Sequence, residues 1–111
     1  MIEKIQTIST TSTRNPGNLT AACAMRLSPD EKYVYCTNAG ENTVSIYSRD
    51  EKSGLLTMIC CLPVSGEYPK DVAVFPDQKH IASINHDSGS ISFFEVDYEK
   101  ASSLCADAAS W

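Results

Sequence analysis

The hydrophobic positions of this chain come in short runs that are separated by turn-forming residues. The runs are rich in Val, Ile, Thr, Tyr and Phe, which favour β-strands, and no longer stretch shows the spacing of a helix. The pattern predicts strands over 21–28, 33–37, 43–48 and 55–61, and again over 71–75, 80–84 and 90–97. Residues 2–9 are expected to form an outer strand left over from a preceding unit. The expected fold class is therefore all-β.

The same order of turns and strands occurs twice. When the sequence is shifted by 47 positions, Pro29-Asp30 falls on Pro76-Asp77. The other identical pairs are Lys32 with Lys79, Asn38 with Asn85, Ser45 with Ser92 and Asp50 with Asp97. A repeat in the high forties lies in the range of β-propeller blades.

Several of the predicted strands carry apolar residues on both faces. Residues 72–75 and 91–94 show this pattern, so each needs cover on two sides. Neighbouring blades of a propeller supply such cover. Two repeats bury one interface between blades and leave two outer faces bare. This predicts either a fragment of a longer propeller or self-association through the exposed blade faces.

The repeat suggests four segments along the chain. Residues 1–19 are expected to hold an outer strand of a preceding blade and a connecting loop, and 20–69 the first blade repeat. Residues 70–104 are expected to be a second, incomplete blade repeat, followed by a divergent tail at 105–111. The Ala- and Ser-rich end stands where the repeat needs an apolar strand. This end is interpreted either as a frayed end of the repeat or as a break in the coding sequence that replaced the next strand of the blade.

Composition narrows the classes of function. The 111 residues carry a net charge of −5, and the 9 Lys and Arg are scattered, which argues against a nucleic-acid partner. No apolar run approaches the length of a membrane span, and the start of the chain lacks a secretory signal, so a cytoplasmic location is expected. The 5 Cys include no Cys-x-x-Cys pair for zinc. Cys36 and Cys60 are expected to be small buried hydrophobes.

Several motifs of the sequence resemble those of a known family. Tyr35-Cys36-Thr37-Asn38 is similar to the Tyr-Val-Thr-Asn signature of propeller strands, with Cys in place of Val. Longer strings that resemble the seven-bladed propeller lactonases lie at 27–35, 42–47, 68–77 and 85–94. That family includes bacterial 6-phosphogluconolactonase and the fungal carboxymuconate cyclase. The resemblance implies about two four-stranded antiparallel blades of a seven-bladed ring. It also implies hydrolysis of a sugar lactone, with no required metal or other cofactor.

Opening a lactone requires a general base for water and positive groups or hydrogen-bond donors for the oxyanion. Arg26 and Lys70 are the candidate substrate-binding cations, because both lie where an innermost strand would line the channel. His86, at a predicted strand end, is the candidate base, although the catalytic residue stays unknown at this stage. Asp71 and Asp87 are either carboxylate bases or residues that cap turns.

Each candidate also has a purely structural interpretation. Lys70 can be a solvated lysine and His86 an ordinary loop histidine. His80 follows a Pro-Asp turn and is expected to be structural. The repeat-matched Asn38 and Asn85 are also expected to be structural, as turn residues. The sequence contains no Gly-x-Ser-x-Gly elbow, phosphate-binding loop or set of metal ligands.

Three functional hypotheses follow. In the first, the chain is a fragment of a lactonase whose complete ring hydrolyses a sugar lactone, and the fragment alone is inactive. In the second, it belongs to a non-catalytic interaction propeller, because fold does not determine function. In the third, it is a truncated product without independent activity.

Overall fold

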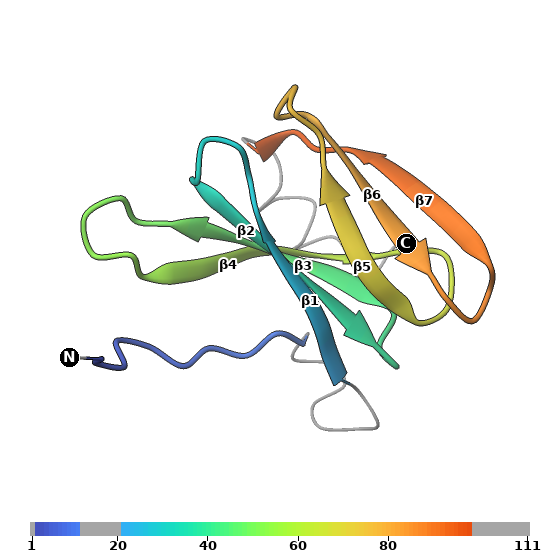
Figure 1. Cartoon of the computed structure of the whole chain (residues 1–111), viewed down its shortest axis with the longest axis horizontal. Coiled ribbons are helices and arrows are strands. Elements are labelled where there is room, and N and C mark those ends of the chain that lie inside the picture. The colour runs from blue at the N-terminus through green and yellow to red at the C-terminus, as the bar shows by residue number, and fades with distance from the viewer. Residues whose placement is uncertain (1, 12–20, 99–111) are drawn as a thin grey trace.

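The structure is a computed structural model that describes residues 2–11 and 21–98. Two antiparallel β-sheets make up the fold, and they contain the seven strands of the described residues (Figure 1). The first sheet has the strand order β1-β2-β3-β4, and the second has β5-β6-β7. The strands are β1 (Ala21–Leu27), β2 (Tyr33–Ala39), β3 (Thr43–Arg49), β4 (Leu56–Pro63), β5 (Pro69–Val74), β6 (His80–Asn85) and β7 (Ser90–Glu95).

Each of the seven predicted strands within the two repeats is present, with ends that differ by one or two residues. The turns form as their residues dictate. In the first repeat, the Asp30 carboxylate accepts hydrogen bonds from the Ser28 hydroxyl at 2.7 Å and from the backbone N–H of Lys32 at 3.1 Å. In the second, Asp77 accepts from the backbone N–H groups of Lys79 and His80. His80 also contacts Asp77 through Nδ1, in the structural position expected for it.

Residues 2–9 form no strand within this chain, and their place as an outer strand of a preceding blade stays a prediction. Residues 2–10 are extended, but they pair with no strand in the described part of the chain. Side chains of the first sheet hold this segment instead. Tyr47 donates its hydroxyl hydrogen to the Ser9 carbonyl at 2.6 Å, and Gln6 exchanges two hydrogen bonds with the backbone of Leu56. The segment therefore lies against the first sheet without joining its hydrogen-bond ladder.

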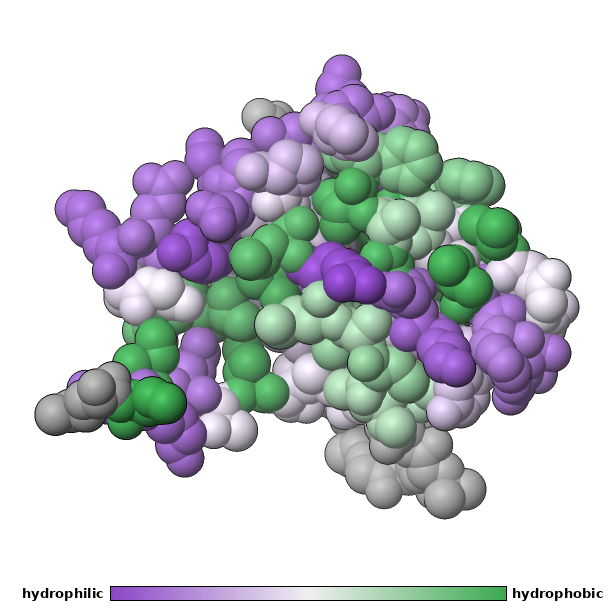
Figure 2. All heavy atoms as spheres, in the orientation of Figure 1, coloured by the Kyte–Doolittle hydropathy of each residue, from purple (hydrophilic) through white to green (hydrophobic). Residues whose placement is uncertain are grey.

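The core lies between the two sheets, which pack face to face. Buried apolar side chains from both sheets form one cluster, made of Tyr35, Val44, Ile46, Cys60, Leu62 and Val64 from the first sheet and its exit, and Val72, Ile81 and Val96 from the second. The faces that point away from this core remain partly apolar, and Figure 2 shows apolar surface over the three-stranded sheet. Strands that are apolar on both faces therefore bury one face here, as the sequence pattern predicts.

Buried Asn38 and Asn85 play the same part in their respective sheets. The Asn38 side-chain amide donates to Thr43 Oγ1 at 3.0 Å and Ser45 Oγ at 2.9 Å. The Asn85 amide donates to Ser90 Oγ at 3.2 Å and Ser92 Oγ at 2.9 Å. Their role is structural, as predicted, but they join the second and third strands of each sheet, whereas the prediction placed them in turns. Buried polar groups need such partners.

The same network links each sheet to the segment that precedes it. Ser92 Oγ donates to the carbonyl of Val64, which directly follows β4. Ser45 Oγ donates to the carbonyl of Thr10, and the Asn38 amide donates to the same carbonyl. The Thr10 carbonyl therefore accepts hydrogen bonds from the first sheet in the same way that the Val64 carbonyl accepts one from the second. Residues 2–11 occupy the place that the end of β4 occupies one repeat later.

Candidate functional site

The candidate site is built on the innermost strands, β1 and β5, which are edge strands of their own sheets and pack against each other (Figure 1). Both strands carry a bulge at the same repeat position. In β1 the register shifts between Ala22 and Met25, and in β5 it shifts between Pro69 and Asp71. A bulge redirects the side chains at its site, and bulges are common beside functional sites.

The bulge in β5 contains Lys70, whose side chain is exposed. Counting back 47 positions, its equivalent in β1 is Cys23, which is an exposed free thiol. Arg26 therefore does not take the place of Lys70 in the first repeat. The two cations lie at different depths along their strands.

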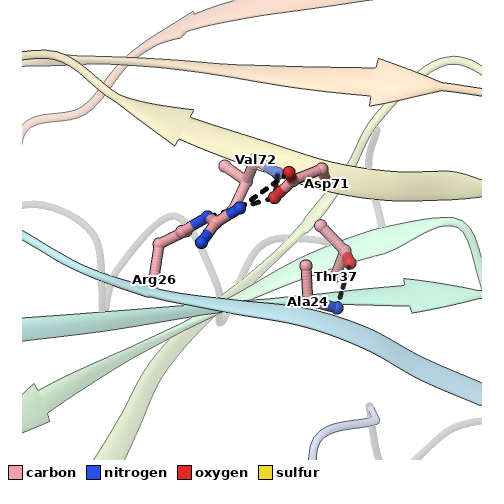
Figure 3. Close-up of polar contacts among 5 residues, drawn as sticks. All are labelled: Ala24, Arg26, Thr37, Asp71 and Val72. Atoms are coloured by element: carbon pink, nitrogen blue, oxygen red, sulfur yellow. Dashed lines mark hydrogen bonds and ion pairs between the residues drawn. The ribbon is translucent and has the colours of Figure 1, made fainter.

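Arg26 and Asp71 join the two innermost strands through a two-pronged ion pair (Figure 3). Arg26 Nη2 lies 2.8 Å from Asp71 Oδ2, and Arg26 Nε lies 3.2 Å from Asp71 Oδ1. The hydrogen bond from Arg26 lowers the pKa of the Asp71 carboxyl, and a hydrogen bond from the backbone N–H of Val72 also lowers it. Asp71 is thereby held as a carboxylate, and Arg26 donates two of its five N–H groups to it.

The loop between β6 and β7 returns to the start of β5. The backbone N–H of His86 donates to the Tyr68 carbonyl at 2.9 Å, and that of Asp87 donates to the Glu67 carbonyl at 3.1 Å. His86 Nδ1 lies 3.1 Å from Asp87 Oδ1, and its ring meets the Tyr68 ring edge-on with centroids 6.1 Å apart. Both polar side chains of this loop remain largely exposed.

All five residues singled out from the sequence thus meet the short segment 67–71. Lys70 and Asp71 belong to it, Arg26 binds Asp71, and the loop that carries His86 and Asp87 is bonded to its first two residues. The sequence suggested these residues one by one, from two repeats. Pairing within the second sheet gathers four of them, and the packing of β1 against β5 adds Arg26.

Tyr68 and Asn42 complete the local geometry, and sequence reasoning did not identify either as a site residue. Tyr68 has a φ of 61°, which is rare for an aromatic residue and is further disfavoured before Pro69. The Asn42 side-chain oxygen accepts a hydrogen bond from the Tyr68 backbone N–H at 3.0 Å and so supports this conformation. Strained backbone concentrates at functional sites. The Tyr-Pro pair and the Asn beside a glycine-containing loop were the available signals.

The segment lacks a complete catalytic constellation. The segment offers the exposed ammonium group of Lys70 and the Asp71 carboxylate, which is already paired with Arg26. The loop bonded to it adds the His86 imidazole, whose Nδ1 lies beside the Asp87 carboxylate. Within residues 2–11 and 21–98, no three His, Cys, Asp or Glu side chains are grouped as metal ligands.

Cys36, Cys60 and Cys61 are buried, which confirms the interpretation of Cys36 and Cys60 as small hydrophobes. Burial raises the pKa of Cys36 and of Cys61. No helix in the described residues is long and apolar enough to cross a membrane.

Two packed, repeat-related antiparallel sheets with adjacent innermost strands define a part of a β-propeller. The chain belongs to the family described as lactonases with a seven-bladed β-propeller, which it matches over residues 1–104. The predicted family and fold class are both confirmed.

Individual relatives give the same picture. The chain is 32% identical over 77 residues to a protein named 6-phosphogluconolactonase from Formosa agariphila, and 25% identical over 76 residues to one of the same name from Bacillus subtilis. Each match covers 68% of this chain and 22% of the relative. A crystal structure of a protein from Bacteroides fragilis, designated a presumptive 6-phosphogluconolactonase, superposes with a TM-score of 0.76 at 28% identity. That match covers 91% of this chain and 27% of the other. The chain thus spans about a quarter of the length of these relatives.

Proposed function

We propose that this chain supplies two adjacent blades to the substrate mouth of a lactonase that hydrolyses a sugar lactone such as 6-phosphogluconolactone. The observation that carries the proposal is the convergence of Lys70, His86 and the Arg26–Asp71 pair on the segment 67–71. Membership of the lactonase family and the names of the two relatives support the choice of substrate class.

In this proposal Lys70 binds the anionic group of the substrate. Its ammonium group lies on the bulge of an innermost strand, and Arg26 is already committed to Asp71. An ammonium group gives a phosphate or carboxylate a charge-assisted hydrogen bond, which is stronger than a neutral one. Arg26 takes a supporting part in substrate binding, because its pairing with Asp71 holds β5 and its bulge beside β1.

His86 is the proposed general base. With Nδ1 bonded to the Asp87 carboxylate, the neutral ring places its proton on Nδ1 and leaves the Nε2 lone pair for water. The activated water forms a bond to the lactone carbonyl carbon, and its proton passes to Nε2. Collapse of the tetrahedral intermediate breaks the ring C–O bond, and the departing alkoxide takes a proton from the imidazolium. The product is the open-chain hydroxy acid.

The experiment uses a hybrid ring. Residues 21–98 of this chain replace the matching blades of the Formosa agariphila relative, and ring opening is followed by acid release at constant pH. We expect the hybrid to hydrolyse 6-phosphogluconolactone. The expected losses are about 100-fold or more in kcat for His86→Gln and about tenfold in affinity for Lys70→Gln.

Lys52→Gln, in an exposed turn between β3 and β4, serves as the matched control and should leave both values unchanged. The proposal is contradicted if Lys70→Gln and His86→Gln leave the kcat and KM of the hybrid unchanged. A folded hybrid without turnover, together with a protein partner captured by pull-down, favours the interaction propeller instead. The unmodified 111-residue chain is expected to show no turnover. A cytoplasmic location for the chain stays a prediction, and cell fractionation tests it.

A further inference from the structure

The outward face of the second sheet carries an apolar patch made of Ile84, Ile91, Phe93 and Phe75. Phe93 is 69% exposed and Ile91 is 60% exposed. The rings of Phe75 and Phe93 meet edge-on with centroids 6.3 Å apart. We call these four residues the open face. An exposed cluster of large apolar side chains on a sheet indicates an interaction surface.

The internal repeat shows what this face is shaped to contact. Counting back 47 positions, Phe93 corresponds to Ile46 and Ile91 to Val44. Both of these residues are fully buried, because the second sheet covers them. The open face is therefore the repeat copy of a face that is completely covered one sheet earlier.

The chain also carries the complementary surface. Within the molecule, Val72 and Val74 of β5 belong to the cluster that covers Val44 and Ile46. Their repeat equivalents on β1 are Met25 and Leu27, which are 66% and 49% exposed. One molecule therefore displays both halves of its own internal interface, on opposite sides.

The strand count points the same way. Among the described residues, β7 pairs only with β6, so the other edge of β7 has no strand beside it. Residues 2–11 lie against the first sheet in the place that the end of β4, a fourth strand, takes against the second. If the first sheet of one copy stacks on the second sheet of another copy, as the two sheets stack within one molecule, residues 2–11 of the first copy lie beside the free edge of β7 in the second. An unpaired edge strand is a ready template for such pairing.

We propose that copies of this chain associate head to tail. Met25 and Leu27 of one copy cover the open face of the next, and residues 2–11 add a fourth strand beside β7. Such an interface is heterologous, so it builds a closed ring or an open chain. With two sheets per copy, three or four copies give six or eight sheets, which lies within the range of about four to eight blades in propellers.

The test is the oligomeric state of the full 111-residue chain, measured by analytical ultracentrifugation over a range of concentrations. We expect a discrete oligomer. Leu27→Asp damages one surface and Phe93→Asp the other, and a buried aspartate is expected to weaken association roughly 100-fold in each case. Each variant alone should be monomeric. A mixture of the two should form a dimer with one copy of each, because each retains the surface that the other has lost.

Hydrogen exchange adds a second measurement. Amide protons on the outer edge of β7 should be protected in the oligomer and exchange rapidly in the Phe93→Asp monomer. Lys52→Asp is the control and should associate like the unmodified chain. Circular dichroism checks that both variants are folded, and Met25→Glu with Ile91→Glu is the substitute pair if either is not.

Three results would overturn the proposal. The first is a wild-type chain that stays monomeric at every concentration. The second is a Leu27→Asp variant that still forms dimers, because the open face would then pair with itself. The third is heterogeneous aggregation that neither substitution reduces. Since none of these measurements involves a lactone, their outcome is independent of the proposed activity.

Discussion

Arg26 on β1 and Asp71 on β5 form a two-pronged ion pair that joins the innermost strands of the two sheets, with Nη2 and Oδ2 2.8 Å apart. The residues are 45 positions apart and both are partly exposed. They connect Arg26, the predicted site residue from the first repeat, to the segment 67–71. The pair therefore positions the site more than it stabilises the fold, because exposed ion pairs contribute little.

The first prediction concerns the acidity of Asp71. Arg26→Gln removes the main cause of its low pKa, so the pKa of Asp71 should rise toward the ordinary value of about 4. Carboxyl carbon chemical shifts measured by NMR during an acid titration report this directly. The pKa of Asp30, which the Ser28 hydroxyl holds low, should stay unchanged as the internal control.

The same pair gives a sign for the effect of pH on stability. The pKa of Asp71 is lower in the folded state, so its contribution to stability is present above the unfolded value and is lost as pH falls through the folded value. In Arg26→Gln this acid-dependent loss should be smaller. A variant whose unfolding midpoint changes with pH exactly as the wild type does would show that the ion pair is not formed in solution.

The second prediction concerns position 36 and its repeat equivalent, Ser83. In the second sheet, Ser83 Oγ donates to Asn85 Oδ1 at 3.1 Å. In the first sheet, Cys36 stands at that position, and the buried Asn38 Oδ1 has no hydrogen-bond donor among the described residues. Ser83→Cys should therefore leave a second buried acceptor without its donor and lower the free energy of unfolding by about 1–3 kcal/mol.

Cys36→Ser is the reciprocal variant. The new hydroxyl can donate to Asn38 Oδ1, which offsets the loss of thiol packing in the cluster with Val34 and Tyr47. The net change should be below about 1 kcal/mol. Chemical denaturation of both variants measures the difference. Equal losses in the two sheets would mean that this donor has no energetic role.

The third prediction concerns Gly66, which precedes β5. A Cβ atom at this position would lie 2.5 Å from the side-chain nitrogen of Asn85, which is itself buried and bonded to two serines. Gly66→Ala should cost about 1–3 kcal/mol, because the crowded amide cannot move without losing partners. Asn85→Ala in the same chain should remove most of this additional cost, which a double-mutant cycle measures.

Gly89 provides the matched comparison. A Cβ atom there meets nothing within 4 Å, but the φ of 62° is unfavourable for any other residue. Gly89→Ala should therefore cost about 1–2 kcal/mol through the backbone alone. That cost should not change in the Asn85→Ala background. Coupling at Gly89 as large as at Gly66 would count against a steric origin.

The fourth prediction concerns alkaline pH. Burial raises the pKa of Tyr47 to about 12, and its hydroxyl donates to the Ser9 carbonyl. The unfolded residue ionises near pH 10. The contribution of Tyr47 is thus complete below about pH 10 and is lost between about pH 10 and pH 12. Tyr47→Phe should reduce this loss, as measured by denaturation across the range. Tyr68→Phe, at an exposed ring, is the control and should leave the alkaline loss in place.

The site was only partly predictable. Lys70 and Arg26 lie on β5 and β1, the strands on which the sequence analysis places them. The 47-residue repeat by itself aligns Lys70 with Cys23, and the bulges at the same repeat position in β1 and β5 agree with this alignment. Tyr68 was not predicted because a positive φ before proline has no signal in strand periodicity. Asn42 was missed for a similar reason, since its hydrogen bond to Tyr68 crosses 26 positions.

The sequence by itself determined the seven strands, their turns and the presence of two sheets in the described chain. These follow from side chains and neighbours within one repeat, such as the Asp30 turn or the apolar run at 91–94. The tertiary structure decided which residues meet across the sheets. Arg26 reaches Asp71 and Thr10 takes the place of Val64 because the stagger between sheets is set by side-chain packing in the core, which no pattern within a single strand records.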